Sequence, residues 1–157
     1  MVTVVEDIEL LLRRLDKLIN ELELLRTLPD ERLRLSLAHR RALGRLIKLC
    51  IEVVFHLARH LLILKDPSHT QGDYMVIASK MGELGILPSL LSEYLRRLAL
   101  LREKIIKHPE DIDYNDIHPF LHTYLKGIKE FRQIVAGYIT TEEKREGDER
   151  ESETEQA

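Results

Sequence analysis

One charged segment of the chain has residue types and a spacing that suit chemistry on phosphate esters. It reads LREKIIKHPEDID over residues 101–113, and five residues separate Arg102 from His108. Histidine titrates near neutral pH, so it can take the proton from a ribose 2′-hydroxyl. The arginine guanidinium forks onto phosphate oxygens and can stabilise the charge that builds on them. The pair suits metal-free RNA cleavage; the alternative is that both residues are only the charged end of a helix.

Further basic residues lie close to this pair. Arg96 and Arg97 precede Arg102 by six and five residues, and Lys107 stands directly before His108. Placed on one surface, these side chains would attract a phosphate backbone. We therefore assign Arg96, Arg97 and Lys107 as candidate contacts to RNA phosphates. The alternative for each is a solvated cation that pairs with neighbouring acids.

Histidines and acids crowd the segment HPEDIDYNDIHPFLH at 108–122, which raises the question of a metal site. His118 and His122 are four residues apart and would share a face of a continuous helix. Pro119 lies between them and is expected to disturb the helix at His118. The carboxylate pairs of a di-metal bundle and the residue order of a calcium loop are both missing from the sequence. We therefore expect neither a metal site nor a cofactor.

The rest of the sequence must supply the scaffold for these residues. Its 157 residues are 44% hydrophobic and 32% charged, a balance that suits one globular domain. Leucine dominates and aromatic residues are only 5%, which favours helices over strands. Apolar residues recur every three or four positions in four stripes, which predicts helices that bury one another. The stripes run from Val5 to Leu22, from Leu43 to Leu64, from Leu87 to Ile105 and from Ile117 to Tyr138.

The breaks between the stripes complete the predicted fold. A shorter helix from about Gly72 to Leu84 should stop at Gly85, and Pro109 should end the helix that carries Arg102. We predict an all-α, antiparallel four-helix-type bundle of about five helices over residues 1–139. Residues 140–157 hold eight acids against three bases and no apolar anchor, so we expect an acidic, disordered tail.

Cysteine usage and hydropathy bear on where the protein works. Cys50 is the single cysteine, so no internal disulfide can form, which fits a reducing cytoplasm. No apolar run approaches the roughly 20 residues of a membrane span. Acids rather than basic residues follow the initial methionine, which differs from a signal peptide. We expect a cytoplasmic protein with no membrane partner, in which Cys50 is an inert core residue.

Three segments in order carry a likeness to a known family. They are RRALGRLIKLCIEVVFHLARHLL at 40–62, DYMVIASKMGELGILPSLLSEYLRRLALLRE at 73–103 and EDIDYNDIHPFLHTYLKGIKEF at 110–131. With them, about two thirds of the chain resembles the HEPN toxin family, specifically the HepT-like proteins encoded beside a minimal nucleotidyltransferase antitoxin. GELGILP, followed by a helix that leads to an arginine, is characteristic of that family.

The resemblance implies an all-α bundle that forms a homodimer. It implies that Arg102 and His108 make a metal-independent RNA-cleaving site at the dimer interface. We therefore expect Arg96, Arg97 and Arg102 to line one groove across the dimer. The partners implied are a second copy, RNA and a nucleotidyltransferase-type antitoxin.

The sequence departs from the tighter family pattern at three positions, the first of which is Glu103 in place of an asparagine. When Arg102 and Ile112-Asp113 are aligned, Lys107 takes the place of the histidine, and Pro109 that of the tyrosine to which the partner attaches adenylate. His108 must then act from one residue further along, and Pro109 should end the helix there and leave the imidazole free to swing. The alternatives are a catalytically degenerate HEPN homodimer that binds a nucleotidyltransferase or RNA, and an unrelated helical bundle.

Overall fold

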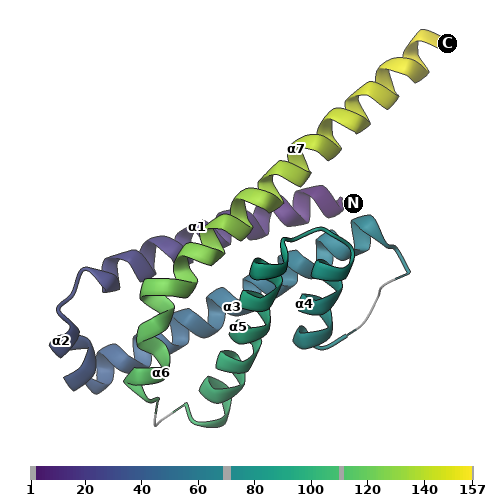
Figure 1. Ribbon diagram of the computed structural model, residues 1–157. Coiled ribbons are helices and arrows are strands. Elements are labelled where there is room, and N and C mark those ends of the chain that lie inside the picture. The colour runs from purple at the N-terminus through teal and green to yellow at the C-terminus, as the bar shows by residue number, and fades with distance from the viewer. Residues whose placement is uncertain (1–2, 69–71, 110–111, 157) are drawn as a thin grey trace.

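A computed structural model describes residues 3–68, 72–109 and 112–156, and within those ranges every regular element is a helix (Figure 1). The predicted all-α class is therefore confirmed. None of the helices in these ranges is long and apolar enough to cross a membrane. The elements are α1 (Val4–Arg26), α2 (Asp30–Leu35), α3 (Leu37–Lys65), α4 (Tyr74–Glu83), α5 (Ser89–Lys107), α6 (Tyr114–Pro119), the π-helical η1 (Phe120–Tyr124) and α7 (Leu125–Gln156).

The long helix α3 lies at the centre of the bundle and contacts every other α-helix. Its partners meet it with the apolar stripes that the sequence predicts. In α1 the buried residues form the predicted stripe with its three- and four-residue spacing: Val5, Ile8, Leu12, Leu15, Ile19 and Leu22. Three phenylalanines, Phe55, Phe120 and Phe131, are fully buried in the common core. Burial of these stripes against α3 holds α5 in place, and α5 carries the candidate site.

Local signals fix the helix ends. Ser36 caps α3 by accepting a hydrogen bond from the backbone N–H of His39, and Asp113 caps α6 in the same way. Gly85 takes a φ of 70° beyond the end of α4, a conformation that glycine adopts without strain. His108 leaves the helix with φ −132° and ψ 60°, outside the α region that the following proline disfavours. Glu110 and Asp111 of the third resembling segment lie outside the described residues.

The last helix continues through Pro119, the residue expected to disturb it at His118. The chain runs from α6 through η1 into α7, and the N–H of Leu125 bonds the carbonyl of Phe120, five residues back. Proline has no N–H to donate to the preceding turn, and a π-turn absorbs that local irregularity without ending the helix. One consequence is that the α6–η1 junction keeps its side chains in a helical arrangement.

The tail at 140–157, expected to be disordered, continues α7 to Gln156, while Ala157 lies outside the described residues. Its helical state follows from the residues of the tail itself, because glutamate, lysine and arginine are good helix formers. Arg145 also pairs with Glu142 at 2.8 Å and with Glu149 at 3.9 Å. None of the described tail residues is buried, and Figure 1 shows this end of α7 projecting beyond the bundle.

Cys50 lies in the core of α3, and burial raises the pKa of its thiol to about 12. Because the thiolate is the nucleophile, we expect the native protein to resist alkylation at pH 8. The same thiol should react readily once urea has unfolded the chain. Mass spectrometry after alkylation checks this, and rapid modification of the folded protein would contradict it.

A bidentate ion pair joins α1 to α7. Nε and Nη2 of Arg132 donate to the two carboxylate oxygens of Asp16 at 2.7 and 2.8 Å, and this hydrogen bonding raises the pKa of Arg132. Both side chains are partly exposed, so we expect Asp16→Asn to lower the free energy of unfolding by up to about 1 kcal/mol. Urea unfolding measures the loss. The control is Glu21→Gln, at an exposed position of α1, which should leave stability nearly unchanged.

Candidate functional site

Three contacts fix the side chain of Arg102 on the side of α5 that faces α3 and α4. Its Nε lies 3.4 Å from Oε1 of Glu52 on α3, and its Nη1 lies 3.9 Å from Oε1 of Glu103. The guanidinium carbon is 4.7 Å from the centre of the Tyr74 ring, a cation–π distance. The side chain keeps a quarter of its surface exposed, so the guanidinium is anchored and still accessible.

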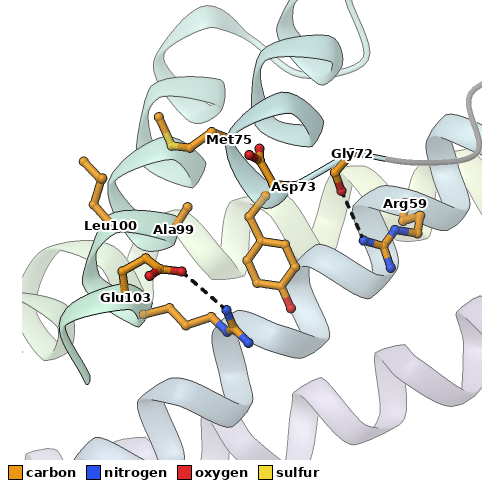
Figure 2. A pocket seen from close by; sticks show the side chains of 9 residues that line it. Arg59, Gly72, Asp73, Met75, Ala99, Leu100 and Glu103 are labelled. Carbon is orange, nitrogen blue, oxygen red and sulfur yellow. Dashed lines mark hydrogen bonds and ion pairs between the residues drawn. The ribbon is translucent and has the colours of Figure 1, made fainter. Parts of the chain in front are cut away.

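Arg102 lines an open pocket of about 400 Å³ between α3, α4 and α5, named here the Arg102 pocket. Arg59 also lines it, and one of its guanidinium nitrogens lies 3.5 Å from the carbonyl oxygen of Gly72. Figure 2 shows Arg59 and Glu103 on opposite sides of the pocket. Two guanidinium groups beside acidic side chains make a site that can exchange a carboxylate for a phosphate oxygen.

Two further pockets follow along α5. The first, of about 510 Å³, is lined by Arg97 and Lys107 and is named here the Lys107 pocket. The second, of about 250 Å³, is lined by His108 and named the His108 pocket. Each of the three pockets is therefore lined by at least one of the candidate site residues that the sequence predicts.

The three pockets adjoin one another. The Arg102 and Lys107 pockets share Leu100 and Glu103 as lining residues. The Lys107 and His108 pockets share Lys104 and Asp116, which form an ion pair of 3.4 Å. Together they make a hollowed band around the exposed side of α5. Within that band the Lys107 pocket separates Arg102 from His108.

The structure brings some of the nominated residues together and keeps others apart. Arg97 and Lys107 share a pocket, whereas Arg102 and His108 line different ones. Six residues along a helix correspond to about 9 Å and about 120° around the axis, which explains the separation. Arg96 lines none of these three pockets; its Nε donates to Glu93 at 3.0 Å. A single chain therefore does not place Arg102 and His108 on one phosphate.

Sequence reasoning did not identify the residues that surround Arg102. Glu52 and Arg59 come from α3, and Tyr74 begins α4, so all three are distant from Arg102 in sequence. Tyr74 stacks on Phe55 with ring centroids 4.2 Å apart, and burial is the main cause that raises the pKa of its hydroxyl. The position of Glu52 in the sequence of α3 does not distinguish it from a solvent-exposed carboxylate. Only the packing of α3 against α5 shows that it is a partner of Arg102.

The structure keeps together the two histidines considered as metal ligands. The rings of His118 and His122 lie 4.5 Å apart, so Pro119 does not separate them. The carboxylate of Asp30, from α2, lies beside them. The helix changes from α to π directly after Pro119, but it continues, so the two histidines stay together.

Comparison with known protein families agrees with the all-α fold. The family model described as ribonuclease HepT-like matches residues 11–135. The chain therefore belongs to the HepT-like ribonuclease family. No curated protein matches it.

Proposed function

We propose that this protein is an endoribonuclease that cleaves RNA without a metal ion, at a site completed when two copies associate. The observation that supports the proposal best is the band of pockets around α5. It is lined in order by Arg102, by Arg97 with Lys107, and by His108. Cations spaced along a groove attract a phosphate backbone, and a histidine in the same groove can move a proton.

The chemistry assigns one role to each of the two central residues. His108 takes the proton from a ribose 2′-hydroxyl, whose oxygen attacks the adjacent phosphorus. Arg102 binds the non-bridging phosphate oxygens as negative charge builds on them. The bond from phosphorus to the 5′-oxygen breaks, and the imidazolium gives its proton to that oxygen. The products are a 2′,3′-cyclic phosphate and a 5′-hydroxyl end.

A second copy is needed because Arg102 and His108 of one chain lie in separate pockets. Apolar side chains stand exposed on the helices that line the band, which suits an interface. Leu100 and Ile106 on α5 are 56% and 42% exposed, and Val76 on α4 is 42% exposed. A copy seated there would cover these side chains, exclude water and bring its own His108 towards Arg102. We therefore propose a homodimer through the α4–α5 face.

RNA must replace the carboxylates that now hold Arg102. Glu52 and Glu103 occupy the donor nitrogens that a phosphate would use. A bidentate phosphate contact is stronger than these long ion pairs of 3.4 and 3.9 Å. The two glutamates thus keep the guanidinium extended into the pocket before RNA arrives.

The direct test incubates the purified dimer with a structured RNA in EDTA. We expect cleavage that continues in the chelator and leaves 2′,3′-cyclic phosphate ends. An RNA with a 2′-deoxy sugar at the cleaved position should resist, because the attacking oxygen is gone. An intact dimer that leaves every RNA uncut would contradict the proposal.

As part of the same proposal, the protein is the toxin of a toxin–antitoxin pair that acts in the cytoplasm. The partner is an antitoxin of the nucleotidyltransferase type. Pro109 has no hydroxyl to accept adenylate, so this partner neutralises the toxin by binding or by modifying another residue. Expression of the protein alone should slow growth, and co-expression of the partner should restore it.

A second candidate function has its own supporting observation. Arg102 is paired with two carboxylates, and Lys107 takes the family's histidine position. These features suit a catalytically degenerate HEPN homodimer that binds RNA or its nucleotidyltransferase partner through the same groove. RNA that is retained by the dimer but stays intact in the cleavage assay would favour this candidate.

A further inference from the structure

Three potential metal ligands meet on the surface of the bundle, from two segments that are far apart in sequence. Asp30 begins α2, His118 lies in α6, and His122 lies in η1. Each offers one ligand atom, and these atoms all lie within 4.8 Å of one another. We infer that Asp30, His118 and His122 form a binding site for a divalent transition-metal ion of the zinc type.

The distances suit an ion between the side chains better than a direct hydrogen bond. Oδ2 of Asp30 lies 3.8 Å from Nε2 of His118, beyond the reach of an N–H···O bond. Zinc binds nitrogen and oxygen ligands at about 2.0–2.2 Å, so two ligand atoms on a tetrahedral ion lie about 3.4 Å apart. Small rotations of these surface side chains would therefore close the site around an ion.

The carboxylate is already oriented for this role. The hydroxyl of Tyr114 donates to Oδ1 of Asp30 at 3.2 Å, which leaves Oδ2 towards His118. Tyr114 is buried, and its ring lies 5.3 Å from the ring of His118. A hydrogen bond to the ligand's other oxygen is the kind of outer contact that fixes ligands in metal sites.

The backbone that carries His118 and His122 is held by buried neighbours. Their rings are 4.5 Å apart across the junction of α6 and η1. Ile117, Phe120 and Leu121, on the other side of the same junction, are fully buried in the core. The π-turn thus presents both imidazoles to solvent from an anchored backbone, and π-turns recur at functional sites.

The ligand types select the class of ion. Two imidazoles and one carboxylate suit zinc, cobalt, nickel or copper rather than calcium or magnesium, which prefer oxygen ligands alone. Three protein ligands leave a fourth position for water. Asp30 and His118 keep 63% and 37% of their side-chain surface exposed, so an ion can enter from solvent.

The ion would tie α2 to the α6–η1 junction. This site is separate from the Arg102 pocket, which Arg59 and Tyr74 line near the other end of α3. The inference therefore stands independently of the proposed ribonuclease, whose chemistry needs no metal. Once bound, the ion would fix the short helix α2 against the bundle.

The experiment uses the full chain without a histidine tag, and Co²⁺ and Zn²⁺ alone as probes. We expect one Co²⁺ per chain with the visible absorption of a four-coordinate ion, and displacement of that ion by Zn²⁺. Saturating Zn²⁺ should raise the melting temperature by several degrees, because it binds only the folded state. His118→Ala and His122→Ala should each weaken binding at least about tenfold.

The matched control is His56→Ala, at the first of two histidines with the same four-residue spacing on α3. Nδ1 of His60 in that pair lies 2.7 Å from the carbonyl oxygen of His56, a local contact within the helix. Binding should be unchanged in this variant, and circular dichroism checks that all variants fold. Absence of saturable binding by the wild type would overturn the inference, as would full binding by both the His118 and His122 variants. RNA cleavage in EDTA is scored separately, so failure of one proposal leaves the other standing.

Discussion

Replacing Arg102 by alanine is expected to slow RNA cleavage by a factor of about 10²–10³, the usual cost of losing one group that stabilises transition-state charge. The pocket keeps Arg59, but its guanidinium lies against the carbonyl of Gly72 and cannot take over the same position. Arg102→Lys should recover part of the loss, because lysine keeps the charge and loses the fork. Single-turnover cleavage rates with saturating RNA measure these effects.

The matched control is Arg96→Ala on the same helix. Arg96 pairs with Glu93 and lines none of the three pockets, so its removal should change the rate by less than about threefold. Thermal melts of both variants test whether the fold survives loss of the contacts to Glu52 and Tyr74. Normal cleavage by Arg102→Ala, or an equal loss in both variants, would remove Arg102 from the proposed site.

The largest effect on stability is expected from Phe131→Ala. Phe131 is fully buried in α7, and a buried phenylalanine replaced by alanine costs about 3–5 kcal/mol through lost contacts and the cavity that remains. That is a large share of the roughly 5–15 kcal/mol that holds a domain together. Urea unfolding followed by circular dichroism gives the change in unfolding free energy.

Gln133→Ala, two residues further along α7 and exposed, is the control for that variant. It should change the unfolding free energy by no more than about 0.5 kcal/mol. The contrast tests whether α7 is held by its buried stripe rather than by helix propensity. A similar, small effect at both positions would contradict the packing described for α7.

Periodicity along the sequence predicts most of this fold, because apolar residues recur along a helix at the spacing of its buried face. The stripe of α1 illustrates this, since its buried residues recur every three or four positions. The helical state of the tail is a different case. Its composition offers no apolar residue to anchor it, but good helix formers can be helical without an anchor.

The surroundings of the site depend on contacts between helices, and spacing within one helix does not reveal them. Glu52 meets Arg102 across 50 positions, and Tyr114 meets Asp30 across 84. Which residues of two helices face each other follows from the packing of whole side-chain surfaces. The separation of Arg102 from His108, in contrast, follows from helix geometry alone once both are placed at the end of α5.

The most direct test of the central claim is a subunit-mixing experiment. Arg102→Ala and His108→Ala chains carrying different tags are co-expressed, and the mixed dimers are isolated and assayed on RNA in EDTA. In a two-fold dimer whose site takes Arg102 from one copy and His108 from the other, each mixed dimer has one intact site of two. We predict inactive homodimers of either variant and mixed dimers with about half of the wild-type activity. Mixed dimers that form but stay as inactive as the homodimers would contradict a site shared between two copies.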